Sequence, residues 1–317
     1  MPGSETVPGL ELIVLIELAL ECIAGTIRTT TGYAQYLRER KQEEMAKFVC
    51  NVISYTLGRT VDITVVIPTP TIPDSMGMTS VTPKHTPSAP YPVLYLLHGG
   101  GNNHATWTGY ANVEFYAEER NIAVVMPSGE NKFYVDWPSD KFFEFISEEL
   151  PDFVSGMFPV SKRPEDTYIA GLSMGGFGTV VHALNFPERF CAFGPISASF
   201  QLINPAALVG TMDPNNLSAS FIRDPDPRFD PSALAEKLAA EGKKFPKCYL
   251  ACGKKDFLYE ANVTFRDRLI ELGCDVTWDE TEEHGHEWRF WNLEIERFLD
   301  WLPRTDLYAM AGRKRQI

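Results

Sequence analysis

Cysteine and histidine are scarce in this sequence, which contains six of each in 317 residues. The cysteines are scattered, at Cys22, Cys50, Cys191, Cys248, Cys252 and Cys274. This pattern is typical of a reduced, cytoplasmic protein and excludes a disulfide-stapled scaffold. Cys248 and Cys252 would stand roughly 13 Å apart on a strand, too far for a disulfide. Because no further Cys or His pair has zinc-site spacing, we expect no metal.

Basic residues and long hydrophobic runs are also few. The chain has 29 Lys and Arg against 42 Asp and Glu, a formal net charge of −13, so we expect neither nucleic acid nor an acidic membrane surface as a partner. The apolar run LELIVLIELALECIAG, residues 10–25, contains three glutamates and lacks a basic segment before it. It is also shorter than the roughly 20 residues that cross a bilayer. We therefore predict neither a signal peptide nor a transmembrane segment, and a cytoplasmic location.

Short apolar, β-branched runs alternate with helical patterns from Thr60 onward. The predicted strands are residues 60–68, 92–98, 122–127, 167–173, 191–198, 247–253 and 275–280. Apolar residues recur at helical spacing before the fourth strand and again after the last one, at Phe142, Phe143, Ile146, Leu150 and Phe153 and at Trp291, Ile295, Phe298 and Leu302. This alternation predicts an α/β protein with a mostly parallel sheet flanked by helices.

Two segments fall outside the alternation. In residues 199–246, a stretch rich in Pro and Asp precedes a short amphipathic helix, which predicts a small cap insertion. The main domain that contains this cap is predicted at 45–317. Residues 1–44 predict a helical extension so apolar that it must pack against the main domain or against another subunit. We favour an oligomerisation arm, and hence a homo-oligomer. A native start at Met45 is the alternative.

The stretch TYIAGLSMGGFGT, residues 167–179, places Ser173 between Gly171 and Gly175. A Gly-x-Ser-x-Gly match arises by chance in roughly a tenth of chains of this length, so a serine in an ordinary glycine-rich turn is the alternative. The context favours a nucleophile, because a strand precedes the motif and a helix can follow it. The sharp turn of a nucleophile elbow also requires very small flanking residues.

A serine nucleophile needs a base, and the base needs an orienting carboxylate. In the α/β-hydrolase arrangement the acid follows a late strand and the histidine precedes the last helix. Asp256 stands in the first position, and both His284 and His286 stand in the second. We prefer His286 because the helix directly after it would hold it rigidly.

The competing acids Asp224 and Asp226 lie within the predicted cap, which makes Asp256 the better candidate.

Two backbone N–H groups should face the oxyanion that forms when a serine attacks an ester. One should come from Met174, directly after the nucleophile. The other should come from the loop HGGG, in which Gly99, Gly100 and Gly101 follow His98. We expect His98 itself to be structural.

Together these motifs resemble a known family. YLLHGGGNNHATW, ISEELPDFV, YIAGLSMGGFG, GKKDFL and HEWRFW are similar to the esterase D group of α/β-hydrolases, especially its tributyrin esterases, and to S-formylglutathione hydrolases and feruloyl or acetylxylan esterases. The resemblance covers roughly residues 45 to 303. It implies Ser173 as nucleophile, Asp256 as acid, His286 as base, and Gly100 and Met174 as oxyanion donors.

The resemblance implies a serine carboxylesterase for small short-chain acyl esters, without a cofactor. A thioesterase, a carbohydrate acyl esterase and a non-catalytic binding protein are the alternatives. Gly99, Gly101, Trp107 and Trp137 are candidate substrate-binding residues. Phe133 and Tyr134 lie in the same loops. For all four aromatic residues, core packing is the competing interpretation.

Overall fold

The computed structural model describes residues 46–204, 221–306, 308, 314, 315 and 317. These residues belong to the unit Glu44–Ile317. The predicted helical extension at 1–44 and the alternative start at Met45 lie outside the described residues, so the oligomerisation arm stays a prediction.

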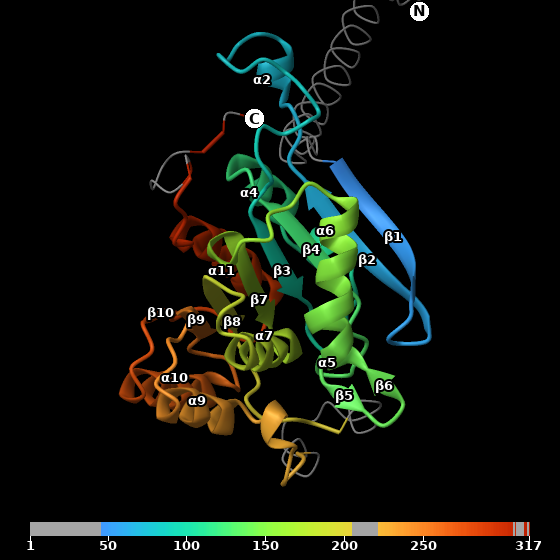
Figure 1. Cartoon of the computed structure of the whole chain (residues 1–317). Helices are drawn as coiled ribbons and strands as arrows, with labels where there is room; N and C mark the ends of the chain where they lie inside the picture. Colours follow the sequence, from blue (N-terminus) through green and yellow to red (C-terminus); the bar gives the residue numbers. More distant parts are fainter. Residues whose placement is uncertain (1–45, 205–220, 307, 309–313, 316) are drawn as a thin grey trace, which may run out of the picture. The chain divides into compact units, whose positions relative to one another are not determined.

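An eight-stranded sheet forms the centre of the described chain (Figure 1), with the order β1-β2-β4-β3-β7-β8-β9-β10. Its strands are β1 (Ala46–Ser54), β2 (Arg59–Ile67), β3 (Val93–Leu97), β4 (Ala123–Pro127), β7 (Thr167–Leu172), β8 (Ala192–Ile196), β9 (Lys247–Gly253) and β10 (Val276–Thr281). β2 runs antiparallel to β1 and β4, and every pair from β4 to β10 is parallel. The predicted mostly parallel sheet is therefore confirmed.

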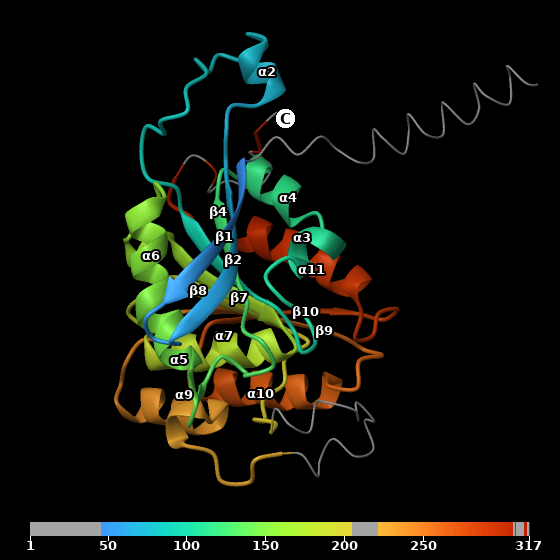
Figure 2. The ribbon, with the colours of Figure 1, turned by 90° about the vertical axis from the view of Figure 1, so that its right-hand side faces the viewer.

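Helices cover both faces of the sheet (Figure 2). One face carries α5 (Phe142–Glu144), the π-helical turn η1 (Phe145–Glu149), α6 (Leu150–Met157), α7 (Met174–Asn185), α9 (Pro231–Ala240) and α10 (Tyr259–Glu271). The other carries α3 (Thr106–Tyr110), α4 (Val113–Glu119) and α11 (Trp288–Trp301). Each face of the sheet has its own hydrophobic core. In β3, Tyr95 and Leu97 point into the core under α7, and Leu94 and Leu96 point into the core under α11, because side chains alternate along a strand.

The remaining elements are short. They are α2 (Ile72–Ser75), the hairpin β5 (Asp136–Trp137) and β6 (Asp140–Lys141), and the turns η2 (Pro164–Asp166) and η4 (Pro227–Phe229). Within the described ranges, every helix is too short or too polar to cross a lipid bilayer.

The helix predicted within the cap segment forms as α9. Leu234 and Leu238 of α9 are buried in the core on the α7 face, and Glu236 pairs with Arg268 of α10 at 2.8 Å. α9 is therefore part of the helical layer. The predicted cap over 199–246 includes 205–220, which lie outside the described residues, so the cap stays a prediction.

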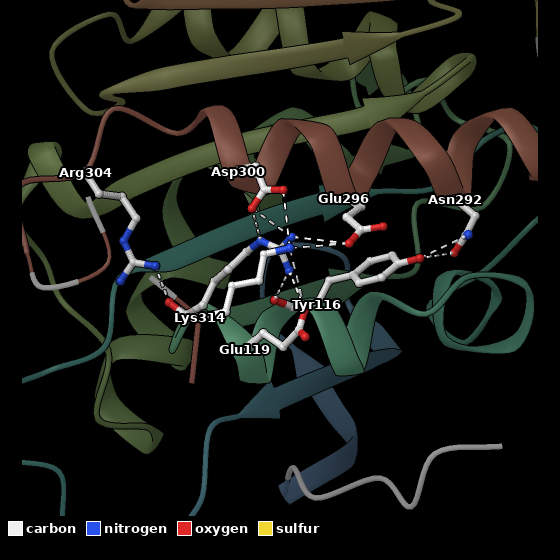
Figure 3. Close-up of polar contacts among 8 residues, drawn as sticks. Tyr116, Glu119, Asn292, Glu296, Asp300, Arg304 and Lys314 are labelled. Carbon is white, nitrogen blue, oxygen red and sulfur yellow. Dashed lines mark hydrogen bonds and ion pairs between the residues drawn. The ribbon is translucent and has the colours of Figure 1, made fainter. Parts of the chain in front are cut away.

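Polar contacts fix α11 against α4 (Figure 3). The guanidinium of Arg120 donates to Asp300 at 2.9 Å, and the amide of Asn292 donates to the hydroxyl of Tyr116 at 3.2 Å. Lys314, near the C-terminus, pairs with Asp300 at 3.4 Å. Because α11 begins two residues after His286, these contacts also hold that histidine in place.

Candidate active site

Ser173 occupies the turn between β7 and α7. Its φ of 55° and ψ of −115° place it in a region that residues with a side chain rarely adopt. Its backbone N–H donates to the carbonyl of Ile196 at 2.9 Å. Strained backbone of this kind is kept where the surrounding structure over-determines it, and here it projects the serine from the end of a buried strand.

The two flanking glycines have a steric explanation. A Cβ at Gly171 would lie 2.5 Å from the carbonyl of Gly175, and a Cβ at Gly175 would lie 2.4 Å from the carbonyl oxygen of Leu97. Both contacts are with backbone, which cannot rotate away as a flexible side chain can. The close approach of α7 to the end of β3 therefore depends on glycine at both positions.

Ser173, His286 and Asp256 form a continuous hydrogen-bonded chain. The Nε2 of His286 lies 3.0 Å from the Oγ of Ser173, and the Nδ1 of His286 lies 2.9 Å from the Oδ2 of Asp256. The carboxylate of Asp256 is fully buried, and its Oδ1 accepts the backbone N–H of Leu258 at 2.9 Å. A carboxylate at Nδ1 favours the proton on that nitrogen, which leaves Nε2 free to accept the hydroxyl proton.

The competing residues stand elsewhere. The Nδ1 of His284 lies 2.9 Å from Glu287, and its backbone carbonyl accepts the N–H of Lys255. Asp226 caps η4 and pairs with Arg228 at 2.7 Å.

Asp224 lines a separate cavity beside Trp137. Neither Asp224 nor Asp226 hydrogen-bonds His286.

The glycine loop after β3 lies beside Ser173. A Cβ at Gly99 would lie 2.4 Å from the side chain of Leu172 and 3.4 Å from the Cβ of Ser173. Gly100 and Met174 line the cavity at the serine. In the described part of the chain, neither residue's N–H donates to a protein acceptor. Two free backbone donors thus border the same cavity as the serine hydroxyl.

The side chain of His98 fixes the glycine loop through hydrogen bonds to backbone groups. The N–H of Gly129 donates to its Nε2 at 2.8 Å, so the ring proton sits on Nδ1, which donates to the carbonyl of Gly99 at 2.8 Å. The hydroxyl of Tyr134 donates to the backbone carbonyl of His98 at 2.9 Å. Burial lowers the pKa of His98 to about 4, which keeps the ring neutral at neutral pH. This contact set agrees with the structural role expected of His98.

The cavity at Ser173 has a volume of about 160 Å³. Its walls come from six separate segments, and include Phe133, Ile203, Phe257, Leu258 and Trp291. The ring of Trp291 packs edge-on against that of His286, with the centroids 4.9 Å apart. Phe133 lies in one of the predicted pocket loops, although core packing was the competing interpretation, and Trp291 belongs to the predicted helix core. Phe257 was not predicted, although its position directly after Asp256 was a usable signal.

The predicted substrate-binding residues separate into two groups. Gly99 lines the cavity, whereas Gly101 does not; its N–H donates to the side chain of Asn131 at 2.7 Å. Trp107 is fully buried, and its indole donates to the carbonyl of Leu97 at 3.1 Å, so it belongs to the core. Trp137 lines the neighbouring cavity of about 300 Å³ and not the one at Ser173.

The cysteines described by the structure are free thiols: Cys50, Cys191, Cys248, Cys252 and Cys274. Among the residues the structure describes, no group of three or more His, Cys, Asp or Glu side chains is arranged to hold a metal ion.

Comparison with known proteins identifies the family. The family model described as "Putative esterase" matches residues 69–296. An acetyl esterase of Caldicellulosiruptor saccharolyticus is 34% identical over 224 residues, covering 67% of this chain and 83% of the relative.

Two solved structures from Staphylococcus aureus are also similar. Fluorophosphonate-binding serine hydrolase F has 30% identity and a TM-score of 0.69, over 82% of this chain and 99% of that one. An S-formylglutathione hydrolase has 32% identity and a TM-score of 0.67, over 81% and 98%. The chain therefore belongs to the esterase family, as its motifs predict, and is a serine hydrolase that cleaves carboxylic esters.

Proposed function

We propose that the protein is a carboxylesterase for short-chain acyl esters, with Ser173 as nucleophile, His286 as general base and Asp256 as the orienting acid. One observation carries this proposal. The hydrogen-bonded chain from Ser173 through His286 to a fully buried Asp256 provides a nucleophile, a base of defined tautomer and a fixed negative charge.

In the first half of the reaction, the Oγ of Ser173 attacks the ester carbonyl carbon while its proton passes to the Nε2 of His286. The carboxylate of Asp256 stabilises the resulting imidazolium. The N–H groups of Gly100 and Met174 donate to the oxyanion, and each such donor lowers the barrier by about 3 to 4 kcal/mol. The C–O bond to the alcohol then breaks, and the alcohol oxygen takes the proton from His286.

In the second half, a water molecule attacks the acyl-enzyme while His286 accepts its proton. The same two N–H groups stabilise the second tetrahedral intermediate. Collapse of this intermediate releases the carboxylic acid and returns the proton to Ser173. Each step uses groups of this chain and the two substrates, ester and water.

The size of the site supports a short acyl group. Its volume of about 160 Å³ is below the roughly 300 to 1,000 Å³ of pockets that take drug-sized ligands. Its walls at Phe133, Ile203 and Phe257 are apolar, which suits an acyl chain and offers no partner for a charged one. The similarity to an acetyl esterase points in the same direction.

Hydrolysis of p-nitrophenyl acetate and butyrate tests the assignment. Ser173→Ala should lower kcat by more than about a thousandfold with the fold intact by circular dichroism. His286→Ala should lose comparable activity, while the matched variant His284→Ala should retain it. Full activity in Ser173→Ala would refute the proposed nucleophile, and the reverse order of the two histidine variants would make His284 the base.

A second candidate function uses the same residues on a thioester or a sugar ester. The similarity to an S-formylglutathione hydrolase favours including the thioester. A panel of p-nitrophenyl acetate, S-formylglutathione, an acetylated sugar and a feruloyl ester, compared by kcat/KM, distinguishes these substrates. Absence of turnover on every member would favour a non-catalytic protein.

A further inference from the structure

A second cavity lies far from Ser173, between α6, α7 and the sheet, on the face where these two helices lie (Figure 2). Its volume is about 470 Å³. The floor includes Thr167 and Ile169 of β7. Thr167 begins the strand that ends just before Ser173, and six residues of strand span roughly 20 Å. The cavity therefore opens toward the opposite end of the sheet from the proposed catalytic residues.

Tyr95 stands on the floor of this cavity with an unpaired hydroxyl. Its side chain is only 7% exposed, yet it has no hydrogen-bond partner among the described residues. The other buried tyrosines that the structure describes all have one, namely Tyr116, Tyr134, Tyr168 and Tyr249. The hydroxyl of Tyr95 is not among the fully enclosed side-chain atoms that lack a partner in the described chain, so it borders the open space of the cavity. A tyrosine hydroxyl in such a place can bond to a molecule in that space. The exception indicates that something outside the chain satisfies Tyr95.

His182 of α7 adds a second buried polar atom to the wall. It is 1% exposed, and its Nε2 lies 3.0 Å from the carbonyl oxygen of Tyr134. That contact requires the ring proton on Nε2, so Nδ1 is left as an acceptor, and it has no partner in the described parts of the chain. Burial lowers the pKa of His182 to about 4, so the ring is neutral at neutral pH. Tyr95 and His182 both line the cavity, so its wall combines a hydroxyl with a neutral imidazole.

The rest of the lining mixes apolar side chains with the hydroxyl groups of Ser147, Ser155, Ser161 and Thr167. Ile146 and Ile169 are buried, whereas Phe186 and Phe190 are half-buried and line the cavity. The charges at the rim are Asp152, Lys162, Glu188 and Arg189, two of each sign. Balanced charges favour neither an anion nor a cation, and apolar walls with a few polar atoms are typical of small-molecule sites.

We propose that this cavity binds a neutral aromatic compound with one hydroxyl group, that is, a phenol. The hydroxyl of Tyr95 donates to the phenol oxygen, and the phenol O–H donates to the Nδ1 of His182. The ring of the ligand packs against Phe186 and Phe190. An ester carbonyl or an ether satisfies Tyr95 but not His182, which makes the hydroxyl the distinguishing group of the ligand.

Titration calorimetry with 4-propylphenol tests the proposal, with 4-propylanisole as the matched ligand that lacks the O–H donor. The phenol should bind the full-length wild-type protein at least about fivefold more tightly than the anisole, as one lost hydrogen bond predicts. Tyr95→Phe keeps the ring and removes the hydroxyl, and should weaken phenol binding by about three- to tenfold. Ser155→Trp, which fills the cavity wall, should abolish it.

Two controls separate this site from the proposed catalytic one. Tyr95→Phe should hydrolyse p-nitrophenyl acetate at the wild-type rate. Protein with Ser173 replaced by alanine should bind the phenol with unchanged affinity. No binding at millimolar phenol, equal affinity for the anisole, unchanged affinity in Tyr95→Phe or Ser155→Trp, or loss of binding in Ser173→Ala would each overturn the proposal and leave ordered water as the partner of Tyr95.

Discussion

The substitution Gly175→Ala tests how closely the proposed catalytic elements must approach. The added methyl carbon would lie 2.4 Å from the carbonyl oxygen of Leu97 and 2.7 Å from that of His98. These separations fall roughly 1 Å short of a normal contact of about 3.5 Å. Both neighbours are backbone at the end of β3, so relief requires α7 and the glycine loop to move apart.

Two consequences follow, with different magnitudes. Overpacking of this kind costs about 1 to 3 kcal/mol, which lowers Tm by roughly 2 to 12 °C in a chain of this size. Separation of α7 from the loop also moves the N–H of Met174 away from that of Gly100. Loss of one such oxyanion donor costs about a hundred- to a thousandfold in kcat. We therefore expect activity to fall far more than stability.

The assay is kcat on p-nitrophenyl acetate, with Tm from a thermal melt of the same sample. Gly156→Ala is the matched control, because a Cβ at this position of α6 would meet nothing within 4 Å. It should leave kcat unchanged and keep or raise Tm. If Gly175→Ala keeps kcat within about twofold of wild type, the close approach of α7 to β3 is not what organises the site.

Three further predictions concern other parts of the molecule. Tyr134→Phe removes the hydrogen bond to the carbonyl of His98, and should cost about 1 kcal/mol by urea unfolding and lower kcat without changing KM; an unchanged kcat would show that the loop holds without it. Burial, with Asp279 beside it, raises the pKa of Glu294 to about 7, above the roughly 4.3 of an unfolded chain. The folded state therefore holds that proton to higher pH, and stability falls as pH rises through this window. Glu294→Gln should gain about 3 kcal/mol over wild type at pH 8 and nothing at pH 4 by urea unfolding, and an equal gain at both would contradict the assignment. Removal of residues 1–44 should lower the number of subunits per particle, measured by light scattering, if they form an oligomerisation arm, whereas an unchanged subunit number would count against one.

The sheet could be predicted because each buried strand requires a short run of apolar residues, which is visible in the local sequence. A run such as VLYLL in β3 is buried on both faces, so it is apolar throughout and bounded by turn residues. The motif at Ser173 was predictable for a steric reason, since the contacts of Gly171 and Gly175 exclude any larger residue. Asp256 and His286 were chosen from their positions after late strands. In a parallel sheet, the loops that follow neighbouring strands lie at the same edge, beside the turn that holds Ser173.

The lining of the site could not be predicted in the same way. Trp107 follows the glycine loop closely and was a candidate for the substrate-binding face, yet the turn into α3 directs its indole to the core. Phe133, Ile203 and Trp291 reach one cavity from different segments. Which side of a loop faces a cavity depends on packing between distant segments, and no local pattern of residues encodes it.

The separation of the proposed catalytic residues along the chain has a consequence for folding. Ser173 and His286 are 113 positions apart, and Asp256 and His286 are 30 apart. Contacts of such long range form late, because the loops between them must close first. Ester hydrolysis can therefore report completed folding: during refolding from urea, activity should return with the slowest phase, after helical circular dichroism has recovered.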